Sequence, residues 1–382
     1  MTTLETLGHF LATPGIGAKS EHVLRRHVID IVSTWIAGAA IPEGAAIAAL
    51  DLGTSALDAL AKNVAFARAS EIDDIHLSSL TTPGAAIVPS ALTIAAQENV
   101  GAEDLTDAVA AGYEALIRLG TAISGPTVLF RGIWSTYFAA PFGVAATTSR
   151  LLKLTASQTA HALALSINLA SPNAGHQHGA HTSRWLAFGL MARAGATAAF
   201  AARAGFIADL DVLESPFLAN AYQLKPDLTA LTDDLGARLA AEDLSFKPWC
   251  AARQTMAAAQ AMRELIAAGV SPDDIQHVEA AIPPLHVKMV DHGVHASDRT
   301  SHLTSLPYQL AIAAIRPNAA MDVRQAPQSL EDDVAAFMRK VSVRGDEGLS
   351  TAYPKAWHAR VTVKTRAGTR EKLVTEIGRA HV

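Results

Sequence analysis

The hydrophobic pattern of the chain changes once, near residue 270, and this change restricts the folds it can adopt. From Ser20 to about residue 268, apolar residues recur at the i, i+3, i+4 and i+7 spacing of amphipathic helices. Beyond residue 270, short segments alternate between apolar and polar residues or are β-branched, which is typical of strands. We therefore expect a mainly α protein, with a large all-α domain (1–250) and a smaller α+β domain (251–382).

Four segments of the first domain carry helix-end signals. They are 20–39, with Ser20 as N-cap; 102–120, ending at Gly120; 155–170, with Thr155 and Gln158 in capping-box spacing; and 183–205, ending at Gly205. The last of these is rich in alanine and apolar almost all round, which predicts a central, buried helix.

In the second domain the pattern predicts strands separated by two helices. The strands are expected at 276–284, 285–291, 340–345 and 358–376, with Ala367-Gly368 turning a hairpin in the last, and the helices around 305–315 and 329–340.

Composition excludes several classes of protein. The net charge of -5, with no basic stripe, argues against nucleic-acid binding. The single cysteine, Cys250, rules out an intrachain disulfide and suits a reducing compartment. The N-terminus lacks the pattern of a signal peptide, and the apolar stretch 27–41 contains Asp30 and is too short to span a bilayer. We expect a cytoplasmic protein with no membrane partner.

Residues 71–84 (EIDDIHLSSLTTPG) gather acids and an imidazole beside a turn. If a helix persists, Glu71 and Asp74 share one face, as do Asp73 and His76. One interpretation is an ordinary helix end with solvated acids. The other is an acid/base site, which depends on what else in the chain converges on it.

Residues 171–185 (SPNAGHQHGAHTSRW) contain His176, His178 and His181. Imidazole is a common metal ligand, but HExxH and a third ligand type at short spacing are missing from the sequence. We favour a glycine-containing loop whose histidines and Arg184 meet an anionic substrate. A solvated loop is the alternative, and we expect no metal.

Further candidates lie toward the second domain. Lys247 stands beside Trp249 and could anchor a carboxylate or act as a base, or its stem could merely cover the indole. Tyr308 is expected in the first turn of a helix, where the backbone dipole favours a phenolate or a bound anion; a core tyrosine is the alternative. Asp291, His292 and His295 are expected in a loop after a strand. Cys250 is expected to be a small core residue.

Taken in order, these segments resemble the MmgE/PrpD family from about residue 5 to about residue 376. The resemblance rests on EIDDIH…TTPG, FRGIWSTYFAAPFGVAA, SRWLAFGLMARAGATAAFAARAGF, FKPWCAARQ and SLPYQLA. That family includes 2-methylcitrate dehydratase, cis-aconitate decarboxylase and an iminodisuccinate epimerase. The resemblance implies a helical domain with an α+β lid, a homodimer, and no metal or organic cofactor.

The resemblance and the local patterns described above together give the candidate site residues, with His76, His178 and His181 taken from the local patterns. The catalytic candidates are Lys247, Tyr308, His76 and Asp73, and the substrate-binding candidates are Glu71, Asp74, Thr82, Arg131, Trp134, His178, His181, Arg184 and Arg253.

The chain departs from the family pattern at several of these positions. Thr82 and Trp134 replace histidines, and Glu71 and Ile75 stand where an aspartate and a threonine are usual. Arg184 replaces a lysine, which keeps the charge but cannot act as a base. Asp73 and Asp74 remain candidates for a structural role that fixes His76 and the turn.

The groups that bind anions are thus kept, while part of the imidazole set is lost. We expect proton transfer at a carbon next to a carboxylate of a small polycarboxylate, in a pocket between the two domains. A dehydratase like 2-methylcitrate dehydratase is the first interpretation. The alternatives are an epimerase of an acidic substrate such as iminodisuccinate, and an inactive paralogue that binds a carboxylate.

The last six residues, Ile377 to Val382 (IGRAHV), follow the final expected strand without a cap or a closing helix. They can be encoded by a string that reads like a sequencing adapter. We therefore expect a C-terminally truncated chain whose natural form is longer. A genuine short tail is the alternative, which a stop codon after Val382 in genomic DNA would establish.

Overall fold

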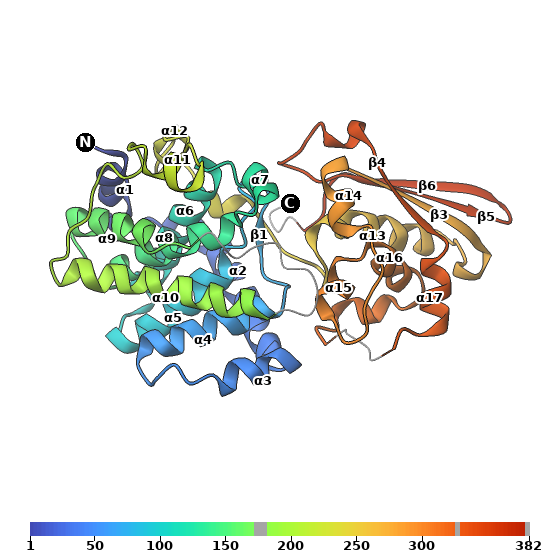
Figure 1. Cartoon of the computed structure of the whole chain (residues 1–382), viewed down its shortest axis with the longest axis horizontal. Coiled ribbons are helices and arrows are strands. Elements are labelled where there is room, and N and C mark those ends of the chain that lie inside the picture. Colours follow the sequence, from blue (N-terminus) through green and yellow to red (C-terminus); the bar gives the residue numbers. More distant parts are fainter. Residues whose placement is uncertain (172–181, 325–328, 379–382) are drawn as a thin grey trace. The chain divides into compact units, whose positions relative to one another are not determined.

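A computed structural model describes residues 1–171, 182–324 and 329–378 (Figure 1). Contacts between Cα atoms divide these residues into two compact units. The described part of the first, which we call the helical unit, is 1–171 and 182–246; that of the second, the α+β unit, is 247–378. The chain is mainly α, as the hydrophobic pattern predicted.

The helical unit consists of helices and one short antiparallel pair of strands, β1 and β2. Its elements are α1 (Thr3–Ala12), α2 (Glu21–Ala39), α3 (Pro42–Ala49), α4 (Ala56–Ala69), β1 (Ile75–His76), α5 (Gly84–Glu98), α6 (Ala102–Ala122), α7 (Gly125–Val128), α8 (Ser135–Leu151), α9 (Ala156–Asn168), α10 (Ser183–Arg203), α11 (Phe217–Tyr222), α12 (Thr229–Thr232) and β2 (Leu244–Ser245).

Helix α8, not α10, is the most buried helix of this unit. Every residue of α8 is buried, and α6 and α10 pack against it. Helix α10 buries only one side, on which glycine lets neighbouring backbones approach closely. A Cβ at Gly189 would lie 2.2 Å from the carbonyl oxygen of Ala61 in α4, and one at Gly195 would lie 2.2 Å from that of Pro141 in α8. The prediction of a central helix holds, since α10 packs against α4, α5, α8 and α9, but only one side of it is buried.

The predicted helix ends are right in part. The capping box of Thr155 and Gln158 is confirmed. Ser20 directly precedes α2, but its hydroxyl donates to Glu242 Oε1 at 2.6 Å and makes no capping bond. Helix α6 does not end at Gly120 but continues to Ala122. The glycine allows close packing instead, since a Cβ there would lie 2.5 Å from Thr81 Cγ2.

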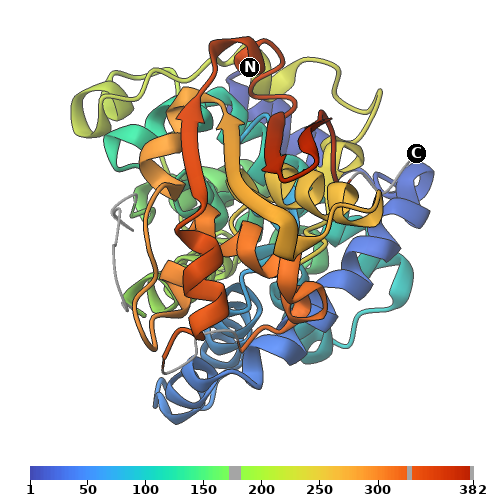
Figure 2. The same cartoon turned by 90° about the vertical axis from the view of Figure 1, so that its right-hand side faces the viewer.

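The α+β unit has a four-stranded sheet in the order β4-β3-β5-β6, with β3 and β4 parallel and the other pairs antiparallel (Figure 2). Helices α13 and α16 pack against this sheet. The elements are α13 (Arg253–Ala267), β3 (Ile275–Ile282), α14 (Pro284–Val290), α15 (Arg299–Thr304), α16 (Leu306–Ile315), α17 (Asp332–Met338), β4 (Val341–Gly345), β5 (Ala359–Thr365) and β6 (Gly368–Val374).

Three of the four predicted strand regions and both predicted helices are confirmed in this unit. The segment 285–291 is not a strand: it lies in α14, which starts with Pro284 at its first position, where the absent N–H costs nothing. The hairpin turn is Arg366-Ala367, one residue earlier than predicted, and Gly368 begins β6 with φ 130°.

Among the residues that the structure describes, one helix, α10, is long and apolar enough to cross a membrane by length and composition alone. The most apolar 18-residue stretch of this helix is 50% buried inside the protein, as in the core helices of many soluble proteins. The bent pair α2 and α3 would pass the same test only if counted as one span.

Candidate functional site

The acidic segment that follows α4 is not helical. Helix α4 ends at Ala69, and Glu71 has the left-handed φ of 62°. The predicted shared helical faces therefore do not form. Glu71, Asp73, Asp74 and His76 are all buried, so a helix end with solvated acids is also wrong. Buried carboxylates need cations or hydrogen-bond donors nearby, and these acids have both.

Two arginines neutralise Glu71 and Asp73. Arg68 Nη1 lies 2.8 Å from Glu71 Oε2 and 2.9 Å from Asp73 Oδ1, and Arg184 pairs with Glu71 Oε1. Burial alone would lower the pKa of Arg68, but the charges of Asp73 and Glu71 raise it above its ordinary value. We call Arg68, Glu71, Asp73 and Arg184 the ion cluster. It holds two positive and two negative groups.

Aromatic side chains surround the ion cluster. The indole N–H of Trp185 donates to Glu71 Oε1 at 3.1 Å. The Arg184 guanidinium carbon lies 5.4 Å from the centre of the Trp185 ring and 6.0 Å from that of Trp134. Trp134, which stands where the family pattern has a histidine, therefore offers a π face to the cation.

Two buried hydroxyls near the start of α8 have no hydrogen-bond partner among the described residues: Tyr137 Oη and Thr82 Oγ1. Burial raises the pKa of Tyr137, and the charges of Arg68 and Arg184 lower it in part, so the phenol lies near the ion cluster. The amide of Thr82 donates to Thr136 Oγ1 at 3.1 Å. The sequence reasoning missed Tyr137, because an isolated tyrosine in an apolar helix gives no local signal.

Asp74 belongs to a separate buried network. Its carboxylate accepts from the Gly84 amide at 2.8 Å and from Tyr113 Oη at 2.9 Å, and it lies 3.1 Å from His27 Nδ1. The His27 ring stacks on Phe246 at 4.4 Å. Asp74 thus connects α2 and α6 with the start of α5, which supports the structural alternative for this residue. His27 and Tyr113 were not predicted.

His76 is neutral at physiological pH. Burial lowers the pKa of its imidazole to about 4. The Ser79 amide donates to Nδ1 at 3.2 Å, and the Ser79 hydroxyl lies 2.8 Å from the same nitrogen. Because an amide can only donate, Nδ1 accepts and the proton is on Nε2. His76 is therefore a neutral hydrogen-bonding group and not a cation.

The low pKa of His76 predicts a loss of stability in acid. Between pH 6.5 and about 4 the unfolded chain binds a proton at His76 that the folded chain does not, so unfolding becomes easier as the pH falls. From pH 7 to pH 5 the wild type should lose about 2 kcal/mol more free energy of unfolding than His76→Asn, which cannot titrate. Urea unfolding at both pH values measures this difference. Equal losses in the two proteins would contradict the assignment.

The α+β unit has three buried basic side chains in and near the segment that leads into α13 and α15: Lys247, Arg253 and Arg299. We call them the cationic group. Burial raises the pKa of Cys250 to about 12, and the charges of Arg299 and Lys247 act against this rise, so both lie near the thiol. The Ala252 amide donates to the Leu303 carbonyl at 2.8 Å, which ties α13 to α15. Cys250 is buried, which confirms it as a core residue.

Arg253 has unused donors. Its Nη2 donates to the Ile377 carbonyl at 2.7 Å, but Nε and Nη1 have no partner in the described parts of the chain. Burial lowers its pKa to about 10, although the charge of Glu376 raises it in part. At neutral pH Arg253 is still a cation, with two buried N–H-bearing nitrogens available to an acceptor.

Tyr308 lies in the first turn of α16, as predicted, where the Ser305 hydroxyl caps its amide at 3.3 Å. Its ring meets that of His302 edge to face, with the centres 4.8 Å apart. Burial raises the pKa of Tyr308 to about 12. The expectation that the helix dipole favours a phenolate is therefore wrong, because desolvation outweighs the dipole and keeps the phenol protonated.

Arg131 does not join either group. Its exposed side chain donates to the carbonyls of Tyr222 and Gln223, at 3.3 and 2.9 Å, and so closes the end of α11. His292 follows helix α14 and not a strand, and its Nε2 lies 3.1 Å from Thr304 Oγ1.

The structure therefore brings the predicted residues together in two sets. Glu71, Asp73, Trp134 and Arg184 meet in the helical unit. In the α+β unit, Arg253 begins α13 and Lys247 lies in the segment before it, near Cys250. A cleft shared by Lys247, Arg184 and Tyr308 stays a prediction, because these residues belong to different units. His176, His178 and His181 lie outside the described residues. Within the described ranges, no three His, Cys, Asp or Glu residues form a metal-binding group.

Comparison with known families identifies both parts of the chain. Residues 9–227 match the MmgE/PrpD N-terminal domain, and residues 249–381 match the MmgE/PrpD C-terminal domain. A search of curated proteins finds no match.

Proposed function

Because the chain belongs to the MmgE/PrpD family, we propose that it is an enzyme that moves a proton at a carbon next to a carboxylate of a small polycarboxylate. The family includes dehydratases and related enzymes. One observation carries the choice of an anionic substrate: the buried guanidinium of Arg253, whose Nε and Nη1 have no partner among the residues described.

An unsatisfied buried guanidinium is costly, because desolvation of the charge and of each N–H is not repaid. A carboxylate is a suitable acceptor for either free nitrogen, because a hydrogen bond between a charged donor and a charged acceptor is stronger than a neutral one. Arg299 adds positive charge near the start of the same helix, and the N-cap of α13 is Ala252, which has no capping side chain. These features support a ligand with more than one carboxylate.

In the first candidate reaction the protein is a dehydratase like 2-methylcitrate dehydratase. Lys247 Nζ would take the proton from the carbon next to a carboxylate. The electron pair would form a C=C bond while the C–O bond breaks, and Tyr308 would protonate the departing hydroxide to give water. A phenol whose pKa is raised to about 12 is protonated at neutral pH and so suits the role of acid.

The second candidate is an epimerase of an acidic substrate such as iminodisuccinate. The observation that favours it is the loss of imidazoles: Thr82 and Trp134 replace two histidines, and His76 is neutral, with its pKa lowered to about 4. Epimerisation removes a proton and returns one to the opposite side, with no leaving group to protonate. Lys247 and Tyr308 are the proposed pair of groups.

Incubation in D₂O separates these candidates. Citrate-like and aspartate-like acids would first be screened by thermal shift, and each acid that binds would then be followed by NMR and ultraviolet absorbance. A new alkene absorbance supports the dehydratase, and deuterium at the carbon without elimination supports the epimerase. Binding with neither signal would contradict the enzymatic proposal and indicate an inactive paralogue.

Arg253→Met should separate binding from stability. The variant removes a buried charge with unused donors, so we expect the free energy of unfolding without ligand to stay the same or to rise. The affinity for a bound polycarboxylate, measured by calorimetry, should fall at least about 100-fold, because a charge-assisted, desolvated contact is lost. Arg263→Met on the same helix is the matched control, since Arg263 stacks on Trp249 and donates to the Pro317 carbonyl. Equal affinity losses in both variants would contradict the role of Arg253.

A further inference from the structure

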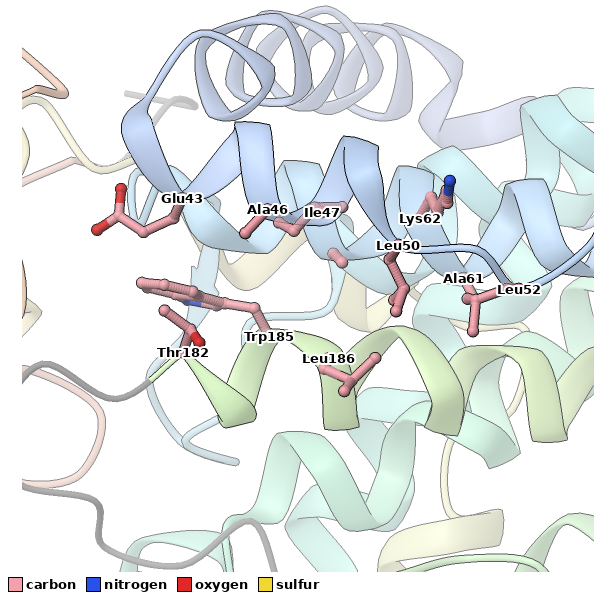
Figure 3. A pocket seen from close by; sticks show the side chains of 11 residues that line it. Glu43, Ala46, Ile47, Leu50, Leu52, Ala61, Lys62, Thr182, Trp185 and Leu186 are labelled. Atoms are coloured by element: carbon pink, nitrogen blue, oxygen red, sulfur yellow. The ribbon is translucent and has the colours of Figure 1, made fainter.

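A cavity of about 150 Å³ lies between α3, α4 and α10 in the helical unit (Figure 3). Figure 3 shows Trp185 and Leu186 of α10 on one side of it and Ala46 and Ile47 of α3 on the other. Its lining includes Ala46, Ile47, Lys62, Ala65, Trp185 and Leu186. Most of these side chains are aliphatic.

We propose that this cavity binds a small, uncharged molecule with a single aromatic ring. Its volume of about 150 Å³ equals that of an engineered apolar cavity in another protein that binds benzene. A ring of that size would gain dispersion contacts with aliphatic groups and with the Trp185 indole. This inference is independent of the proposed function.

The polar groups at the cavity do not favour a charged ligand. Lys62 already donates to the Ala48 carbonyl at 3.1 Å, so its ammonium is engaged at the α3 backbone. Ordered water needs two to four polar partners, and the aliphatic side chains that form most of the wall offer none. The side chain of Leu186 is 41% exposed, so the cavity is bordered by a residue that solvent reaches and a ligand has a way in.

Trp185 links the cavity to the ion cluster. Its ring lines the cavity, while its N–H donates to Glu71 Oε1 at 3.1 Å. Arg184, the preceding residue, pairs with the same carboxylate oxygen. A ligand against the indole would therefore restrict the side chain that helps to hold Glu71. Occupancy of the cavity would thus change the hydrogen bonding of Glu71 in the ion cluster.

Toluene and xenon are suitable probes of the intact chain. We expect millimolar toluene to raise the melting temperature by at least about 1 °C, since a ligand that binds only the folded state stabilises it. A crystal under xenon pressure should show a xenon peak among Ile47, Ala65 and Trp185. In addition, ¹⁹F-labelled tryptophan should show a toluene-dependent shift of the Trp185 resonance, assigned with Trp185→Phe.

Ala46→Phe should abolish both the thermal shift and the xenon peak by filling the cavity from α3. Ala45→Phe is the matched control: Ala45 is also an exposed alanine of α3 but does not line the cavity. If Ala46→Phe does not fold, Ala46→Leu fills part of the same space. No xenon peak in the wild type, or equal toluene effects in the Ala46 and Ala45 variants, would overturn the proposal.

Discussion

Replacing Arg68 by methionine is expected to lower the free energy of unfolding by about 3–5 kcal/mol, the cost of breaking a buried ion pair from one side. Arg68 is 3% exposed and bonds to both Glu71 and Asp73. Without it, both buried carboxylates would lose an ion pair at once. Urea unfolding at pH 7 measures the loss.

Arg193→Met is the control for this prediction. Arg193 lies 3.0 Å from Asp58 Oδ1, but its side chain is 37% exposed, and exposed ion pairs contribute roughly 0–1 kcal/mol. We expect a loss of less than about 1 kcal/mol in this variant. If Arg68→Met were no more destabilising than Arg193→Met, the ion cluster would not be a structural element of the helical unit.

Lys247→Met should reduce turnover at least about 100-fold, which corresponds to about 2.7 kcal/mol of activation free energy. The proposed function makes Lys247 the base, and methionine keeps much of its apolar stem without the amine. Lys247 is 8% exposed and lies near Cys250, so its ammonium is not an ordinary solvated group. Steady-state kinetics on the acid found by the ligand screen measures the effect.

Lys288→Met serves as the control, because Lys288 is an exposed lysine of the same unit. It should keep full turnover. Unfolding of both variants would be measured in parallel, so that a loss of activity is not confused with a loss of structure. A decrease of less than fivefold in Lys247→Met, with substrate binding intact, would remove Lys247 from the catalytic assignment.

The sequence by itself determined the class of fold and most of its elements. Helical and strand periodicities are local properties, and a capping box such as that of Thr155 and Gln158 is complete within four residues. The same reasoning placed Tyr308 in the first turn of its helix. It failed at 285–291, because a short apolar run fits a strand or a helix until tertiary packing decides between them.

Only the tertiary structure decided how each candidate is charged and with which groups it pairs. Glu71 and Arg184 are 113 residues apart, and Tyr113 reaches Asp74 across 39 residues, so no spacing in the sequence predicts either contact. Burial then set the protonation states, with the His76 imidazole neutral and the Tyr308 phenol protonated. It also left two nitrogens of Arg253 without a hydrogen-bond partner among the described residues. The physical reason is that desolvation and ion pairing depend on the groups that packing brings together, whereas helix and strand patterns depend on neighbours along the chain.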